Sequence, residues 1–289
     1  SSTRKDRRLI EKKLAPALGR RKVAEVTRAE IARLHSGMSA TPYEANRALA
    51  LLSKAFNLAE LWGLRPDNTN PTRHVRKYPE TKRKRFLSPA ELARLGATLR
   101  TAERDGFLIL PARSGVREVD RRAPVNPWAV AAIRLLMLTG ARMSEILGLR
   151  WAWIDLARGR ASLPDSKTGE KVIVLPPPAR EVLARLPRAA DNPHVIQGAK
   201  PGAHLVNLKD PWCAIREAAG LDDVRIHDLR HSFASVGAAG GASLPVIGAL
   251  LGHTQAQTTQ RYAHLADDPL QAAAADIGGR IAAAMGEWA

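Results

Sequence analysis

Hydrophobic residues in the first 80 positions recur at the spacing of helices. Ranges 7–18 and 42–62 fit this pattern. Thr27-Arg28-Ala29-Glu30 predicts a helix over 29–36, because the Thr hydroxyl and the Glu carboxylate can each serve a free amide at the helix start. Residues 65–71 are rich in Pro, Asn and Asp and predict a loop. We therefore predict a helical bundle over residues 1–80, with core positions on its third helix at Leu49, Leu52, Phe56 and Leu61.

A second pattern begins near residue 87. Ser88-Pro89-Ala90-Glu91 predicts a helix start, with Ser as N-cap, Pro in the first position and Glu in the third. Residues 105–127 show weak periodicity with several Gly, Pro and Arg residues, so we interpret them as a surface insertion or long loop. Residues 127–139 predict a buried helix that Gly140 ends, and a short helix resumes over 142–149.

Short apolar runs then predict strands at 153–156, 161–164 and 172–175, with Lys167-Thr168-Gly169 as the turn between the last two. Helical patterns fill the rest of the chain, at 179–186, 208–219, 227–239, 244–251, 258–266 and 269–285. The expected fold is mainly α with a small β-sheet, in the α+β class. Residues 1–80 and 87–289 are the predicted domains, joined by a linker at 81–86.

Charge narrows the class of partner. The 289 residues include 45 Lys and Arg against 28 Asp and Glu, a net charge of +17. Such an excess favours a polyanion, because Lys and Arg replace the counterions condensed on phosphates. A merely soluble basic protein is the alternative. The run Lys82-Arg83-Lys84-Arg85 fits either a solvated surface or a basic linker lying on DNA, and its place between two globular patterns favours the linker.

Cysteine content and hydropathy limit the remaining classes. Cys213 is the single cysteine, so an intramolecular disulfide and a Cys-based zinc site are excluded, and a reducing bacterial cytoplasm is the expected compartment. Charged residues interrupt the longest apolar stretches, so we expect no membrane span.

Candidate chemistry lies in short segments that follow one another in a fixed order. These are Thr139-Gly140-Ala141-Arg142, Ser166-Lys167-Thr168-Gly169, His227-Asp228-Leu229-Arg230, Leu250-Leu251-Gly252-His253 and Gln260-Arg261-Tyr262. In this order they resemble the tyrosine recombinase or phage integrase family, whose active site is Arg, Lys, His-x-x-Arg, His or Trp, and Tyr. The resemblance covers nearly the whole chain. Any one of these segments would be weak evidence, whereas the complete ordered set is specific.

The residue types suit attack on a phosphodiester. Guanidinium groups grip non-bridging oxygens in a fork and keep their charge, which is the role expected of Arg142 and Arg230, although a lone Arg is ordinarily a surface residue. Glu145 lies three residues beyond Arg142 on the same helical face, so we expect it to orient that guanidinium. Tyr262 is the expected nucleophile. The resemblance implies a 3′-phosphotyrosyl link and a free 5′-hydroxyl, with no ATP.

The resemblance assigns proton transfer less completely. It makes Lys167 the general acid for the leaving 5′-oxygen, with Lys171 as the main competitor. His227 and His253 could donate to a phosphate oxygen or exchange a proton with Tyr262, and their division of labour stays open. His231 lies one turn beyond His227. We expect it to pack or hydrogen-bond behind the site rather than to form a metal pair, and we expect no metal or cofactor.

The resemblance also implies an assembly. A core-binding helical bundle and a catalytic domain would form a C-shaped clamp on double-stranded DNA. Four protomers would act on two DNA sites, with a monomer or weak oligomer in the absence of DNA and room for an accessory DNA-bending protein. The apolar tail after Asp268 could dock on a neighbour or fold back on its own domain. Alternatives are a type IB topoisomerase or telomere resolvase and, in another class, a non-catalytic basic DNA-binding protein.

Overall fold

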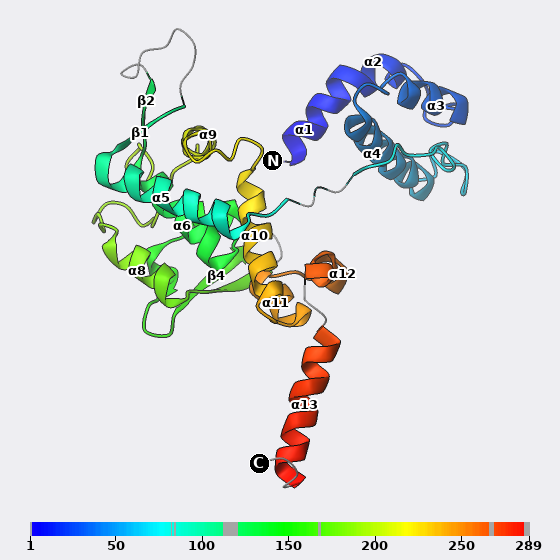
Figure 1. Ribbon diagram of the computed structural model, residues 1–289. Helices are drawn as coiled ribbons and strands as arrows, with labels where there is room; N and C mark the ends of the chain where they lie inside the picture. The colour runs from blue at the N-terminus through cyan, green and yellow to red at the C-terminus, as the bar shows by residue number, and fades with distance from the viewer. Residues whose placement is uncertain are drawn as a thin grey trace. The chain divides into compact units, whose positions relative to one another are not determined.

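The computed structural model describes residues 2–81, 83, 85–111, 121–166, 169–265 and 269–285. The chain divides into two compact units, Ser1–Arg83 and Lys84–Ala289 (Figure 1). Each unit has its own hydrophobic core. The mostly helical architecture with small sheets confirms the predicted fold class.

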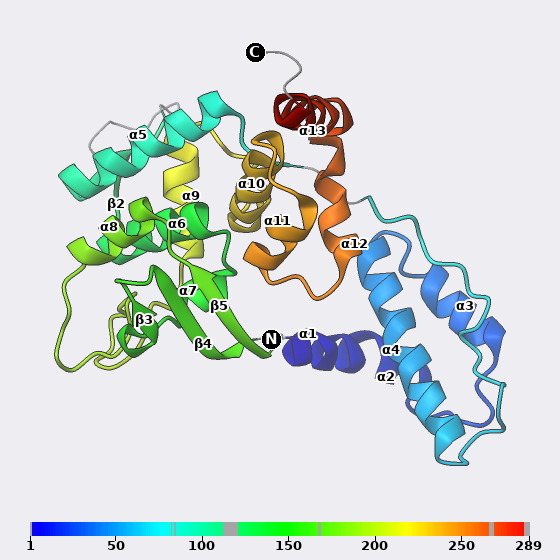
Figure 2. The same cartoon turned by 90° about the horizontal axis from the view of Figure 1, so that it is seen from below.

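The N-terminal unit is a helical bundle. Its elements are α1 (Ser2–Leu9), the π-helical turn η1 (Ile10–Leu14), α2 (Ala15–Leu18), α3 (Arg28–Ser36) and α4 (Pro42–Leu61). Helix α3 begins at the predicted capping box, in which Thr27 Oγ1 accepts a hydrogen bond from the Glu30 amide and Glu30 Oε2 accepts one from the Thr27 amide. Helix α3 packs against α4 (Figure 2).

The core of this unit includes Ile31, Leu49, Leu52 and Phe56. The prediction that Leu61 also faces the core is wrong, since Leu61 is 77% exposed. Successive helical residues turn by about 100°, so a residue five positions beyond Phe56 points roughly 140° away from it. The apolar character of Leu61 therefore gave a misleading signal at the end of α4.

The C-terminal unit opens with α5 (Pro89–Asp105), which begins at the predicted capping box of Ser88 and Glu91. Strands β1 (Phe107–Ile109) and β2 (Arg122–Pro124) then pair antiparallel. The interpretation of 105–127 as a surface insertion or long loop missed these two strands. Each strand spans only three residues, too few for a period of two to stand out in the sequence. Residues 112–120 lie outside the described residues.

Helix α6 (Pro127–Thr139) is the central element of the unit. It packs against α5 and α8 (Pro177–Arg185), and against α10 (Ile226–Ala239). Its alanine and branched side chains are buried on nearly every face, as the mostly apolar sequence predicted, and Arg134 pairs with Glu103 at the surface. Gly140, at φ 62°, ends the helix, and α7 (Met143–Leu147) follows it.

Strands β3 (Ile154–Asp155), β4 (Arg160–Ser166) and β5 (Gly169–Val174) form an antiparallel sheet in that order, at one side of the unit (Figure 2). The 3₁₀ turn η3 (Trp151–Trp153) precedes it. In β5, Lys171 and Ile173 are buried while their neighbours are exposed. Lys171 therefore points into the protein from a strand whose alternation the apolar residues Val172 and Val174 obscure.

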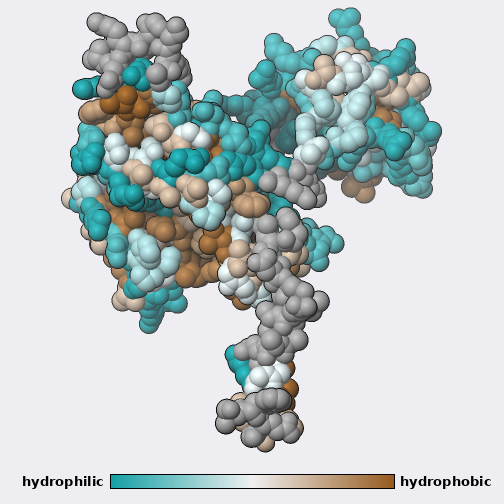
Figure 3. Space-filling view, in the orientation of Figure 1, coloured by the Kyte–Doolittle hydropathy of each residue, from teal (hydrophilic) through white to brown (hydrophobic). Residues whose placement is uncertain are grey.

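Helices complete the chain: α9 (Lys209–Ala218), α11 (Leu244–Leu251), α12 (Ala256–Thr259), the 3₁₀ helix η4 (Gln260–Leu265) and α13 (Pro269–Met285). The single helix predicted over 258–266 is wrong, because α12 ends at Thr259 and the backbone tightens into η4. Helix α10 packs against α11 and η4. Figure 3 shows brown apolar patches interspersed with teal on the visible face of the C-terminal unit. Among the described helices, none combines the length and apolarity that a membrane crossing needs.

Candidate active site

Arg142 occupies the start of α7, directly after the break at Gly140. Its Nη1 donates to Glu145 Oε1 at 2.8 Å, and its backbone amide donates to Glu145 Oε2 at 2.8 Å. Its Nη2 donates to the Gly252 carbonyl at 3.2 Å. The guanidinium is thus fixed from two sides, and its side chain remains 22% exposed. It can meet an anion without first changing conformation.

Lys171 is the other partner of Glu145. Its Nζ donates to Glu145 Oε2 at 2.7 Å and to the Leu251 carbonyl at 3.2 Å. The two side chains are only 6% and 3% exposed, respectively. The sequence pattern offered Lys171 as a rival to Lys167 and did not predict this ion pair. The signal that could have revealed it is the strand period, which puts Lys171 on the same face as Ile173.

Burial and pairing act in opposite directions on this ion pair. Burial alone would raise the pKa of Glu145, but hydrogen bonds from Lys171 and from the Arg142 amide hold that pKa below its ordinary value. Burial lowers the pKa of Lys171, and Glu145 opposes that shift. The Glu145 carboxylate therefore compensates the charges of both Arg142 and Lys171 in a largely buried site.

Arg230 lies on α10 and is 5% exposed. Its Nη1 donates to the Gly140 carbonyl at 2.5 Å and its Nη2 to the Leu251 carbonyl at 2.6 Å. Burial, with the nearby Arg142, lowers its pKa to about 10, so it stays charged at neutral pH. Arg142, Lys171 and Arg230 all donate to the carbonyls that end α11, where the helix dipole favours cations.

Two glycines make this convergence sterically feasible. Gly252 ends α11 at φ 68°, and a Cβ there would lie 2.8 Å from Lys171 Cε. Gly140 adopts φ 62°, and a Cβ there would lie 2.5 Å from Phe233 Cδ1. Both positions combine a left-handed backbone with a close neighbour, so only glycine fits without strain.

Tyr262 lies on η4 and is 4% exposed. Its ring belongs to a small cluster with Ala234, Ile247 and Leu251. Its hydroxyl is 2.5 Å from Nδ1 of His231, which follows Arg230 on α10. Burial raises the pKa of Tyr262, while the nearby Arg261 and Arg230 oppose the rise. The phenol is therefore protonated at neutral pH and needs a proton acceptor before it can attack.

The other two candidate histidines lie on α10 and directly after the Gly252 that ends α11. The ring of His227 lies edge-on to that of His231, with centroids 4.9 Å apart. His253 Nδ1 lies 2.9 Å from Thr259 Oγ1. Burial lowers the pKa of His227, and burial with nearby Arg230 lowers that of His253 to about 4. Both imidazoles are therefore neutral near pH 7 in the absence of a phosphate.

The remaining predicted site residues differ in how they can be placed. Lys167, Lys82 and Lys84 lie outside the described residues. Arg85 donates to Glu91 Oε1 at 2.6 Å and to Asp223 Oδ2 at 2.7 Å. Hydrogen bonds to Glu91 and then to Asp223 raise the pKa of Arg85. Its charge is thus compensated within the protein.

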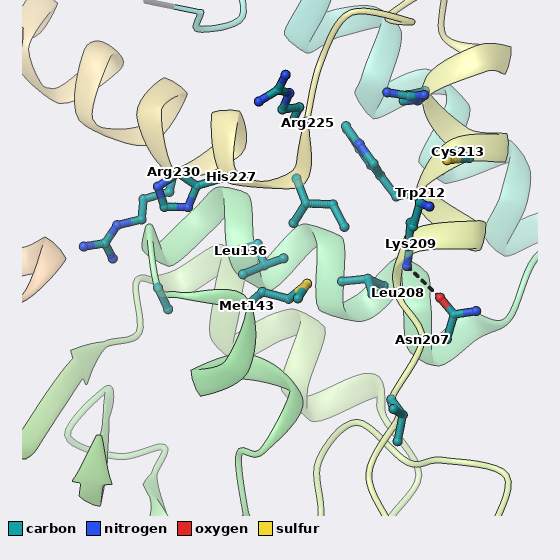
Figure 4. Close-up of a pocket in the computed structure, with 14 residues that line it drawn as sticks. Leu136, Met143, Asn207, Leu208, Lys209, Trp212, Cys213, Arg225, His227 and Arg230 are labelled. Carbon is teal, nitrogen blue, oxygen red and sulfur yellow. Dashed lines mark hydrogen bonds between the residues drawn. The ribbon is translucent and has the colours of Figure 1, made fainter. Parts of the chain in front are cut away.

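An apolar pocket of about 510 Å³ adjoins His227 and Arg230 (Figure 4). Its walls come from α6, α7, α9 and the start of α10, and include Leu136, Met143, Leu208 and Trp212. The site therefore has an apolar wall next to the cations Arg142, Lys171 and Arg230. His227 and Arg230 thus border both the cation cluster and these apolar side chains.

Comparison with known proteins shows which family the chain resembles. The phage integrase family model matches residues 117–268. The tyrosine recombinase XerD of Lacticaseibacillus casei is 30% identical over 249 residues, which are 82% of this chain and 78% of the relative. The shufflon-specific DNA recombinase of Escherichia coli is 30% identical over 221 residues, which are 75% of this chain and half of that longer relative.

Solved structures show the same fold. A lambda integrase dimer bound to a COC′ core site matches with a TM-score of 0.66 at 19% identity, over 91% of this chain and 88% of the integrase chain. The Tn1549 transposon integrase in complex with transposon right end DNA matches with a TM-score of 0.65 at 18% identity, over 96% of this chain and 93% of that chain. The chain therefore belongs to the phage integrase family. Within that family it is a tyrosine-type site-specific recombinase, as the ordered motifs predicted, and the alternative classes are not favoured.

Proposed function

We propose that the chain binds double-stranded DNA and that Tyr262 attacks a phosphodiester, forming a 3′-phosphotyrosyl link and a free 5′-hydroxyl. The observation that carries the proposal is that Arg142 and Arg230 both donate hydrogen bonds at the end of α11. The buried Tyr262 hydroxyl forms a hydrogen bond with His231, the residue that follows Arg230. Two fixed guanidiniums suit the extra charge that develops on the non-bridging oxygens during in-line attack.

Further roles follow from the same geometry. Glu145 holds Arg142, and His227 and His253 donate to phosphate oxygens. Lys167 protonates the leaving 5′-oxygen, because Lys171 is already committed to Glu145 at 2.7 Å. No metal or cofactor enters this scheme. The phosphotyrosyl link conserves the energy of the broken bond, so no ATP is consumed.

We propose that DNA is held by the overall positive charge of +17 and by the basic run at Lys82, Arg83 and Lys84. Arg85 anchors the end of that run through its carboxylate partners. Residues 1–80 would act as the core-binding domain, residues 81–86 as the linker and residues 87–289 as the catalytic domain. The site of action would be the bacterial cytoplasm, where an enzyme with one cysteine and a DNA substrate fits.

The experiment starts from the unknown target sequence. Random-sequence duplexes are selected for binding to the Tyr262→Phe protein, and the recovered duplex is nicked to make a suicide substrate. Wild-type protein should form an adduct that survives SDS, and Tyr262→Phe should bind without forming one. Tyr43→Phe is the matched control, because Tyr43 is 56% exposed and belongs to the N-terminal unit. Absence of any adduct with wild-type protein would refute the proposal.

We further propose that four copies assemble on two DNA sites. A solved lambda integrase tetramer is bound to a Holliday junction, and it matches this fold with a TM-score of 0.56 at 20% identity, over 80% of this chain and 65% of that chain. Helix α13 carries Ile277, Ile281 and Met285 at helical spacing, each more than half exposed, and we propose a second copy of the chain as the partner of this face. Ile281→Asp should weaken assembly on DNA in light-scattering measurements. Ala283→Asp, on another face of α13, should not.

A further inference from the structure

The geometry points to His231 as the base that takes the proton of Tyr262 when the tyrosine attacks DNA. This inference rests on the proposed function, because it requires Tyr262 to be the nucleophile. The sequence pattern left that proton to His227 or His253 and gave His231 a supporting place behind the site. The structure instead puts an imidazole nitrogen of His231 against the reacting oxygen itself, at 2.5 Å.

The placement of His231 follows from the helix that carries it. On α10, His231 is next to Arg230, so the group that would bind the phosphate and the group that would take the proton come from adjacent residues. Helix α10 packs against η4, which carries Tyr262. The tyrosine ring is buried in its apolar cluster, and His231 fixes its hydroxyl. His253 is engaged elsewhere, with Thr259.

The surroundings keep His231 unprotonated before DNA binds. The charged and titratable groups that face it are His227, Asp228 and Arg230 on its own helix, and Arg261 and Tyr262 on η4. Burial, followed by His227 and Arg261, lowers its pKa to about 4, and Asp228 opposes the shift. The imidazole is thus neutral at pH 7. A bound phosphate adds negative charge nearby and favours the imidazolium, which raises that pKa when the proton must be taken.

Base catalysis requires one particular tautomer of the His231 ring. Nδ1 must accept from the Tyr262 hydroxyl, and Nε2 must carry the ring hydrogen. The Nδ1 contact is 2.5 Å, whereas Arg261 Nη1 lies 3.5 Å from Nε2, at the outer limit of a hydrogen bond. A hydroxyl can donate or accept across the 2.5 Å contact, so the proposal specifies the tautomer in which Nδ1 is the acceptor.

The step balances as follows. The Tyr262 oxygen forms a bond to phosphorus, and its proton moves to Nδ1 of His231. The bond from phosphorus to the 5′-oxygen breaks, and that oxygen keeps the electron pair and receives a proton from the general acid assigned above to Lys167. In rejoining, the 5′-hydroxyl attacks the phosphotyrosine and gives its proton back to Lys167. His231 returns the other proton to the departing tyrosine oxygen.

His231→Asn tests the inference on the nicked suicide substrate. The Asn carbonyl can still accept a hydrogen bond near the position of Nδ1, but it cannot be protonated. We expect adduct formation about 100- to 10,000-fold slower, the range typical for loss of a general base, with DNA affinity unchanged. His204→Asn is the matched control, since His204 lies outside the site and bonds to a backbone carbonyl. Imidazole added to His231→Ala should restore part of the rate.

The pH profile separates a base from a structural contact. The wild-type cleavage rate should be nearly flat from pH 7 to 9. The Asn variant should gain about tenfold per pH unit, because hydroxide must then take the proton. A uniformly slower rate with the wild-type profile would overturn the role as base, as would an unchanged rate. Absence of an adduct with wild-type protein would instead refute the proposed function, and this inference with it.

If both His231 variants fail to fold, wild-type protein with ¹⁵N-labelled histidine gives the same decision. Binding of the selected duplex should raise the pKa of His231 by one unit or more. The signals of free protein should show Nδ1 without hydrogen. Hydrogen on Nδ1, or a pKa unmoved by DNA, would overturn the inference.

Discussion

The buried carboxylate of Glu145 should matter more to stability than the lysine that pairs with it. Glu145→Gln removes the anion shared by Arg142 and Lys171, and leaves two cations facing each other beside Arg230. Removing one partner of a buried ion pair costs about 3–5 kcal/mol, because the remaining charge is uncompensated. The Lys171 side chain, 6% exposed, cannot reach water to recover that loss.

Lys171→Met should cost less. Glu145 keeps the Arg142 guanidinium at 2.8 Å and the Arg142 amide at 2.8 Å. The main loss is the charge-assisted hydrogen bond from Lys171 to Glu145, about 1.5–3 kcal/mol. The longer bond to the Leu251 carbonyl is also lost, but Arg230 still donates to that carbonyl. Methionine has a similar length and an apolar end, and burying it offsets part of that loss. The stability of Glu145→Gln should therefore lie at least ~1 kcal/mol below that of Lys171→Met.

Urea unfolding followed by tryptophan fluorescence measures this difference. Trp128, Trp151, Trp153 and Trp212 lie in the C-terminal unit, whereas Trp62 of the N-terminal unit is already 65% exposed and changes little on unfolding. Equal losses for the two variants, or a larger loss for Lys171→Met, would show that Glu145 is not the group on which the cluster depends. Adduct formation should fall in Glu145→Gln even where the protein is folded, because Arg142 loses the partner that orients it.

The other predictions concern substitution of Gly140, the pH dependence of stability and the salt dependence of DNA binding. Gly140→Ala should destabilise by several kcal/mol more than Gly106→Ala in thermal melts, because both adopt positive φ but only Gly140 has a neighbour within 3 Å of the added Cβ; equal losses would leave backbone strain as the whole effect. Stability should fall between pH 6.5 and 4, because His231 and His253 have folded pKa values of about 4, so the unfolded chain binds more protons in that window. His253→Asn should show a smaller loss in urea unfolding over the same range, and an unchanged slope would contradict its burial as the cause. DNA binding by Tyr262→Phe should weaken steeply and log-linearly with salt, whereas a flat response would argue against phosphate contacts.

The sequence by itself was sufficient for several local elements and for the family. Capping boxes at Thr27 and Ser88 and the glycine stop at Gly140 are set by nearest-neighbour chemistry, so they could be predicted without a fold. The ordered motifs identified the family because each residue type is demanded by phosphodiester chemistry. Local sequence patterns did not predict the three-residue strands or the change from α-helix to 3₁₀ helix near Tyr262. Both features depend on packing partners that are distant in sequence.

Only the tertiary structure decided which of these residues touch one another. Lys171 is joined to Glu145 because strand alternation turns it inward and α7 lies there to receive it. Arg142 and Arg230, far apart in the chain, share one helix end because its free carbonyls need donors. His231, which spacing alone placed behind the site, reaches the Tyr262 hydroxyl because α10 and η4 pack together. Sequence specifies the chemical groups, but hydrogen bonds between distant groups exist only once burial has brought their elements into contact.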